Sequence, residues 1–136
     1  MLSVMVSGHF DPFHYAHLDY IKQAAVMGDY LICVVSSDRQ VIMKKGKVNE
    51  PESERAEIMS LILKGLGING RVVVNTWDTY TTQVAIALRQ IKPEIFCRGT
   101  DKILNDMPWE EREICYELGI RIAHAEGKIA HGSTFV

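Results

Sequence analysis

The fold is decided by residues 2–17, LSVMVSGHFDPFHYAH, because they hold an apolar run, a turn and the start of a helical pattern in succession. Leu2–Val6 has the composition of a buried strand, and His17–Met27 carries apolar residues at helical spacing before it stops at Gly28. The turn between them therefore predicts a strand-to-helix junction at the carboxyl edge of a sheet. Because a helix start presents unpaired N–H groups, this turn is an anion-binding position.

The rest of the chain repeats the order of strand and helix. Its apolar runs do not alternate with polar residues, which is typical of strands buried on both faces of a parallel sheet. We therefore predict an α/β fold, a Rossmann-like parallel five-stranded sheet with helices on both faces, in a single domain spanning 1–136. The further strands are expected at Tyr30–Val35, Arg71–Asn75, Glu94–Arg98 and Arg121–Ala125, and the further helices at Glu54–Lys64, Thr82–Ile91 and Trp109–Leu118.

Two segments fall outside this pattern. Ser36–Pro51 is polar and rich in lysine, so we predict an irregular, mobile segment there. Gly65–Gly70 spells the G-x-G-x-x-G of a dinucleotide-binding fingerprint, but it follows a helix and precedes a strand, which reverses the order of that fingerprint. We predict a helix cap and a turn at this position.

The composition excludes several classes of function. A net charge of -2 gives no overall field that would attract nucleic acid or an anionic membrane surface. The amino terminus lacks the basic start and the length of a signal peptide, and no apolar run reaches the roughly 20 residues of a membrane span, so we expect a cytoplasmic protein. Three cysteines, Cys33, Cys97 and Cys115, lie in apolar runs without paired spacing, and we expect them to be buried and inert.

The turn after the first strand carries the residues with chemical potential. Gly8 lets backbone approach a phosphate, and His14 and His17, three residues apart, face the same way at the helix start. Transfer at phosphorus depends on positioned donors and on magnesium, so two imidazoles suit it. Asp11 could hold Mg²⁺ or orient a loop. The histidine pair could also bind a transition metal, although no cysteine or third histidine stands nearby in sequence to complete a metal site.

Gly8-His9-Phe10-Asp11 and the following His14-Tyr15-Ala16-His17 resemble the G-x-F-D-x-x-H-x-G-H signature of cytidylyltransferases and related nucleotidyltransferases. Ala16 stands where that family usually has glycine. The resemblance implies that His14 and His17 are catalytic. It also implies that Gly8, His9, Phe10 and Asp11 bind the nucleotide.

The resemblance extends along the chain. Lys44 and Lys45 lie where the family has a lysine-bearing loop, which implies a catalytic role, and Arg55 lies where a helical arginine meets phosphate. Trp77 resembles the tryptophan that glycerol-3-phosphate cytidylyltransferases place by their acceptor, so Arg55 and Trp77 are implied to bind the acceptor, although Asp78-Thr79 also resembles sugar-phosphate adenylyltransferases such as the heptose enzymes. Further nucleotide-binding residues implied by the family's strand-end and terminal motifs are Arg98, Gly99, Asp101, Ser133 and Thr134.

These motifs are most similar to glycerol-3-phosphate cytidylyltransferase. The resemblance implies transfer of a nucleotidyl group, CMP by preference, from CTP or ATP to a small phosphorylated acceptor with release of pyrophosphate, and Mg²⁺ bound mainly through the triphosphate. Two alternatives stay open: an adenylyltransferase acting on a sugar phosphate, phosphopantetheine or FMN, and a non-catalytic nucleotide-binding relative. By the same resemblance we expect a homodimer that binds no nucleic acid and does not insert into membranes.

Overall fold

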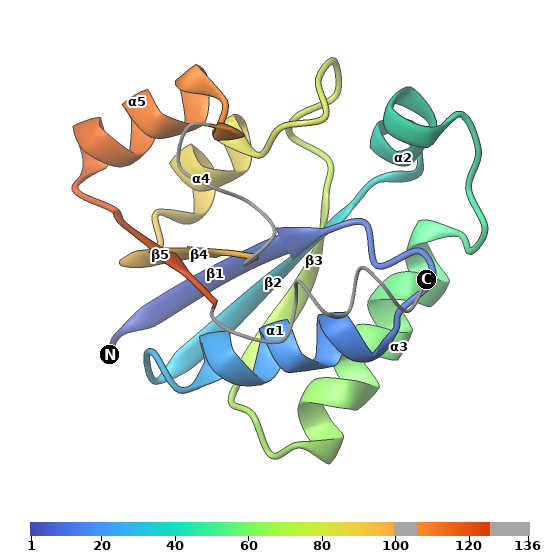
Figure 1. The fold of residues 1–136 in the computed structure, drawn as a ribbon, viewed down its shortest axis with the longest axis horizontal. Helices are drawn as coiled ribbons and strands as arrows, with labels where there is room; N and C mark the ends of the chain where they lie inside the picture. Colours follow the sequence, from blue (N-terminus) through green and yellow to red (C-terminus); the bar gives the residue numbers. More distant parts are fainter. Residues whose placement is uncertain (100–105, 126–136) are drawn as a thin grey trace.

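The computed structural model describes residues 1–99 and 106–125. Strands and helices alternate along the chain, apart from two successive helices, α2 and α3, between the second and third strands (Figure 1). In order, the elements are β1 (Ser3–Gly8), α1 (Tyr15–Ala25), β2 (Tyr30–Ser36), α2 (Asp38–Lys45), α3 (Glu52–Gly65), β3 (Gly70–Asn75), α4 (Ala85–Ile91), β4 (Ile95–Arg98), α5 (Trp109–Leu118) and β5 (Arg121–His124).

The strands form one five-stranded sheet in the order β3-β2-β1-β4-β5, and every pairing is parallel. The predicted parallel five-stranded sheet is therefore confirmed. The chain moves outward from β1 to β2 and β3 and then returns to the other side of β1. The carboxyl ends of β1 and β4 flank the point where this direction reverses, which is where sheets of this kind bind ligands.

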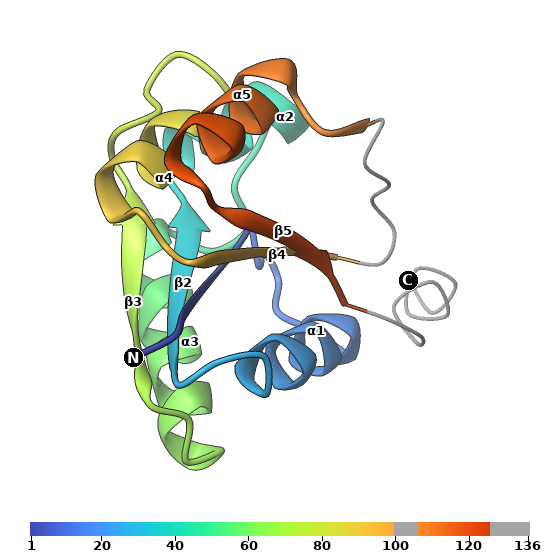
Figure 2. The same cartoon turned by 90° about the vertical axis from the view of Figure 1, so that its left-hand side faces the viewer.

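Helices cover both faces of the sheet, as predicted (Figures 1 and 2). Alternate residues of β1 point to opposite faces: Val4 and Val6 belong to a core cluster with α1 and α3, whereas Met5 belongs to a cluster with α4 and α5. Each face thus has its own apolar core, and β1 is buried between them. The first helix is fixed to the sheet by Tyr20, whose hydroxyl donates a hydrogen bond to the Cys97 carbonyl of β4.

The prediction of an irregular segment is wrong for residues 38–45, which form α2. The helix depends on its ends, because Ser37 Oγ accepts a hydrogen bond from the Gln40 amide while the Gln40 side chain accepts one from the Ser37 amide. Gly46, with φ 85°, ends it in the left-handed conformation. A capping box without a wide apolar stripe explains why hydrophobic periodicity missed this helix.

Other expectations concern boundaries and burial. Observed α1 begins and ends two residues before its predicted range, and α4 begins three residues later than predicted. The Gly65–Gly70 segment joins α3 to β3 through a turn with Gly67 at φ 69°, as expected of a helix cap and turn.

All three cysteines are buried free thiols, and burial raises the pKa of Cys33 to about 12. Among the described residues, no helix is both long enough and apolar enough to span a membrane.

Candidate active site

A cavity of about 830 Å³ opens at the carboxyl ends of β1, β2 and β4. The turn after β1 and the start of α1 form one side of the cavity, and the end of α2 adds lysines to it. The segment before α4 and the start of α5 form the opposite side. The predicted site residues that line it are Gly8, His9, Phe10, Asp11, His14, His17, Lys44, Lys45, Arg98 and Gly99.

The imidazoles of His14 and His17 are stacked, with ring centroids 3.9 Å apart and an interplanar angle of 22°. The His14 amide donates a hydrogen bond of 3.2 Å to His17 Nδ1, so a neutral His17 carries its proton on Nε2. Burial lowers the pKa of His17 to about 4, with contributions from His14, Lys45 and His9. His17 is therefore a neutral hydrogen-bond donor at the start of α1, where anions are favoured.

Phe10 contacts His17 of this pair. Its backbone has φ 51°, its side chain is buried in the core under α1, and its ring meets the His17 ring edge-on with centroids 5.0 Å apart. A Cβ atom at Gly8 would lie 3.0 Å from the Phe10 ring, so the glycine makes room for the phenylalanine. Gly8 and Phe10 thus hold the turn in shape.

Asp11 orients a loop. Its two carboxylate oxygens accept hydrogen bonds from the backbone amides of Asn49 (2.8 Å) and Glu50 (2.7 Å). Burial acts to raise the pKa of Asp11, but these amides and nearby cations outweigh it, and the pKa lies below its ordinary value. Lys45 Nζ donates to the Asp11 carbonyl at 3.1 Å, which draws the end of α2 to the same turn. Of the two roles considered for Asp11, the geometry favours the loop.

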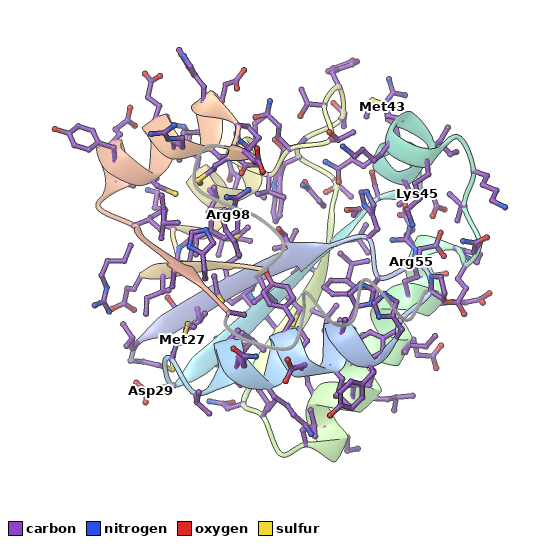
Figure 3. All side chains as sticks on the ribbon, viewed as in Figure 1. Met27, Asp29, Met43, Lys45, Arg55 and Arg98 are labelled. Carbon is purple, nitrogen blue, oxygen red and sulfur yellow. The ribbon has the colours of Figure 1, made fainter. Side chains whose placement is uncertain are left out.

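Arg55 does not reach the cavity, which contradicts the predicted acceptor contact. Its side chain is 0% exposed and donates to the carbonyls of His9 (2.9 Å), Ser36 (2.7 Å) and Glu50 (2.8 Å). It also pairs with Asp38 Oδ1 at 2.8 Å. Figure 3 places Arg55 beside Lys45, where α2 and α3 approach the turn after β1. Arg55 therefore joins the loops that carry the site, and has no surface left for a phosphate.

Trp77 also lies away from the cavity. Its half-buried side chain packs against the core cluster beneath α4 and α5, and its amide donates to Asn75 Oδ1 at 3.1 Å. The predicted acceptor contact for Trp77 is not supported by this position. Arg98 ends β4, is buried, and lines the cavity with Gly99. Three other predicted residues, Asp101, Ser133 and Thr134, lie outside the described residues.

The cavity also has residues that sequence patterns did not single out. Ser36 ends β2 and Gln83 precedes α4, and both line the cavity with Glu111. Glu111 Oε2 accepts the Val84 amide at 2.9 Å, so the start of α4 is occupied by a carboxyl group. Asp78 accepts hydrogen bonds from the amides of Ile86 and Ala87 in that helix. The position of Ser36 at the end of a predicted strand is the one feature of the sequence that points to it as a site residue. Glu111 has no such feature, because acidic residues are common near helix starts.

The described part of the chain holds no group of three or more His, Cys, Asp or Glu residues able to bind a metal ion. Asp11 has both carboxylate oxygens engaged by amides, and Glu111 has one.

Comparison with known proteins places this geometry in a family. A model of the cytidylyltransferase-like family matches residues 5–125. The chain is 25% identical over 137 residues to an FAD synthase from Picrophilus torridus, covering 97% of this chain and 91% of that protein. It is 30% identical over 106 residues to an FAD synthase from Thermococcus kodakarensis, covering 76% of this chain and 66% of that protein.

Two more similarities concern part of a larger protein and the fold alone. The chain is 31% identical over 98 residues to the bifunctional protein HldE of Campylobacter concisus, covering 72% of this chain but 20% of that protein. A lipopolysaccharide core biosynthesis protein from Thermoplasma volcanium has the same fold, with a TM-score of 0.69, 23% identity and coverage of 93% and 97%. Since the family model spans nearly all of the sheet and the histidine turn, the chain belongs to the cytidylyltransferase-like family and is a nucleotidyltransferase.

Proposed function

We propose that the protein is an adenylyltransferase that joins the AMP unit of ATP to the phosphate of FMN, forming FAD and pyrophosphate. The observation that carries this proposal is the similarity to the FAD synthase of P. torridus, because it covers 97% of this chain and 91% of that protein. The expected preference for CMP and glycerol 3-phosphate has less support, because it rested partly on Trp77, which packs against the core instead.

In the proposed reaction, an oxygen of the acceptor phosphate attacks the α-phosphorus of ATP in line with the leaving group. One P–O bond forms, the bond between the α-phosphorus and its bridging oxygen breaks, and pyrophosphate leaves. The Nε2–H of His17 donates to a non-bridging oxygen of the α-phosphate, where negative charge must be stabilised. His14 stacks against that ring and, through its backbone amide, fixes which nitrogen carries the proton.

The lysines at the end of α2 supply positive charge to the remaining phosphates. Lys44 and Lys45 both line the cavity, and the contact of Lys45 with the Asp11 carbonyl holds it next to the histidine turn. Mg²⁺ enters as part of the substrate, MgATP, and neutralises the pyrophosphate as it leaves. The residues therefore supply orientation and charge, which is what phosphoryl chemistry requires of a protein.

The test measures pyrophosphate release with Mg²⁺ while ATP and CTP are crossed with FMN, heptose 1-phosphate, phosphopantetheine and glycerol 3-phosphate. Chromatography of the products identifies FAD, and the His17→Asn variant shows which signal depends on the site. FAD formation with ATP, at least tenfold above every other pair, is the expected result. Efficient transfer to a different acceptor, or from CTP, would replace the proposal.

Transfer to a sugar phosphate is the second candidate, favoured by 31% identity to HldE. It ranks below FMN because the chain spans only 20% of that bifunctional protein, so the similarity does not indicate which activity is shared. Heptose 1-phosphate in the panel decides between the two.

We also propose that the enzyme is a homodimer, which light scattering at several protein concentrations tests.

A further inference from the structure

His9 lines the cavity beside lysines and His17, but its ring and its backbone are both held by contacts with neighbouring residues. Its Nδ1 lies 2.7 Å from Ser36 Oγ, and its carbonyl accepts a hydrogen bond from Arg55, so both its ring and its backbone are fixed. Ser36 Oγ in turn donates to the Gly8 carbonyl at 3.2 Å. The residue that precedes Phe10 in the turn is thus held in one orientation by the ends of β1 and β2.

The hydrogens in this chain of contacts determine the tautomer of His9. A serine hydroxyl has one hydrogen, and that of Ser36 is given to Gly8. If Ser36 gives its hydrogen to Gly8, the 2.7 Å contact is a hydrogen bond that Nδ1–H of His9 donates, and Nε2 keeps a lone pair; this network is the basis on which the tautomer is assigned. His9 and His17 consequently present opposite groups: a bare nitrogen on one ring and an N–H on the other.

His9 Nε2 is accessible from the cavity. Among the described residues, the buried side-chain nitrogen or oxygen that has no hydrogen-bond partner is Nε2 of His124. Nε2 of His9 has no hydrogen-bond partner in that part of the chain and is not one of these buried unpaired atoms, so it is accessible to solvent on a residue that lines the cavity. An accessible acceptor therefore belongs to a residue that lines the cavity together with the donors His17, Lys44 and Lys45.

The surroundings keep this ring uncharged. Burial is the largest cause lowering the pKa of His9 to about 4, followed by the charges of Lys45, Arg55 and Lys44, and Asp11 opposes them weakly. A neutral ring with a lone pair repels a phosphate oxygen, which is itself only an acceptor. The substrate atom opposite Nε2 must instead carry a hydrogen.

We infer that His9 determines acceptor specificity by accepting a hydrogen bond from a hydroxyl that the acceptor carries close to its phosphate. Lys44, Lys45 and His17 line the same cavity and hold the phosphates of ATP in the proposed reaction. The acceptor phosphate must lie next to the α-phosphate for in-line attack, so a hydroxyl close to that phosphate comes near His9, which lines the cavity too. Polyol phosphates have this arrangement, and the ribityl phosphate of FMN is one of them. The choice of FMN as the test substrate rests on the proposed function, whereas the preference for a hydroxyl rests on the tautomer of His9.

The experiment compares FMN with an analogue that lacks the hydroxyl on the carbon next to the phosphate-bearing carbon, in the wild type and in His9→Asn. Asparagine can keep the donor to Ser36 Oγ but has no atom in place of Nε2. Wild-type kcat/KM is expected to be about tenfold higher for FMN than for the analogue, the equivalent of about 1.4 kcal/mol for one hydrogen bond. His9→Asn should lose about tenfold with FMN and less than threefold with the analogue.

Two further arms make the outcomes decisive. ATP is compared with 2′-deoxy-ATP and 3′-deoxy-ATP, because a ribose hydroxyl is the other possible donor, and discrimination there instead would overturn the assignment to the acceptor. Long-range ¹H–¹⁵N spectra of the wild type report which nitrogen of His9 is protonated. A protonated Nε2, or equal losses of His9→Asn with both acceptors, would overturn the inference.

Failure of the proposed function gives a different result. If transfer occurs to another acceptor and no FAD forms, the FMN proposal is refuted, and the hydroxyl comparison is repeated with that acceptor and its deoxy analogue. If no acceptor reacts, the nitrogen spectra still decide the tautomer on which the inference stands.

Discussion

Replacing Arg55 by methionine tests whether this residue holds the site together or contacts the acceptor. Methionine has a stem of similar length, so the packing of the apolar part is largely kept while the guanidinium is removed. The change leaves the buried Ser36 carbonyl without the donor at 2.7 Å, and separates Asp38 from its partner at 2.8 Å. Asp38 is 39% exposed, so the ion pair contributes little, and most of the loss comes from the three carbonyls left without a donor, at about 1–3 kcal/mol each. We expect a destabilisation of about 3–5 kcal/mol in total.

Arg89 provides the matched control. It pairs with Glu117 at the same distance, 2.8 Å, but the two side chains are 47% and 54% exposed. Exposed pairs contribute about 0–1 kcal/mol, so Arg89→Met should barely change the free energy of unfolding. The two ion pairs have the same length, so the comparison tests the burial of Arg55 together with its three hydrogen bonds to carbonyls.

Urea denaturation followed by circular dichroism measures both variants. With a slope of about 2 kcal/mol per molar urea, the expected loss moves the midpoint of Arg55→Met by roughly 2 M. A loss below about 1 kcal/mol, or a loss equal to that of Arg89→Met, would refute the assigned role. An unchanged midpoint together with a raised KM for the acceptor would restore the acceptor contact predicted from the sequence.

His17→Asn keeps an oxygen that can accept the His14 amide but lacks the Nε2–H donor, so kcat is expected to fall about 10²- to 10³-fold with an unchanged circular dichroism spectrum. A kcat within tenfold of the wild type would remove His17 from transition-state stabilisation. The double replacement of Lys44 and Lys45 by alanine is expected to raise KM for MgATP by about tenfold or more, since charge-assisted bonds to phosphate are lost. Lys64→Ala removes a charge at the end of α3 as the control, and an equal effect there would contradict the role of the α2 lysines. The free energy of unfolding should fall as the pH is lowered from 6.5 towards 4, because the folded-state pKa values of His9 and His17 are lowered to about 4 and the unfolded chain binds more protons in that window. Urea titrations at stepped pH measure this slope, and a slope that stays the same when both histidines are replaced by asparagine would assign it to other groups.

Local patterns were sufficient for the sheet and for the histidine pair. Each strand is a short apolar run, and each observed strand lies within two residues of its predicted bounds. His14 and His17 meet because residues three apart at a helix start share a face, which requires no knowledge of distant segments. The order of strands and helices then placed this turn at the carboxyl edge of the sheet.

Contacts between distant segments account for what was missed. Arg55 stands among glutamates in the sequence, which is compatible with an exposed helix start, yet the ends of β1 and β2 bury it in the folded chain. Trp77 is drawn to the core beneath α4 and α5. Neither position follows from hydrophobic periodicity, because each depends on which loops meet after the sheet has formed.

The carboxyl groups at the start of α4 make the two sides of the cavity chemically different. Glu111 and Asp78 take the amides of that helix, whereas α1 at the other side of the cavity offers histidine and the lysines of α2 lie near it. A molecule with phosphates at both ends would set one of them against Glu111, where the amides are already bound. The side of the cavity formed by α1 and the end of α2 is therefore the side better suited to the phosphates of the substrates.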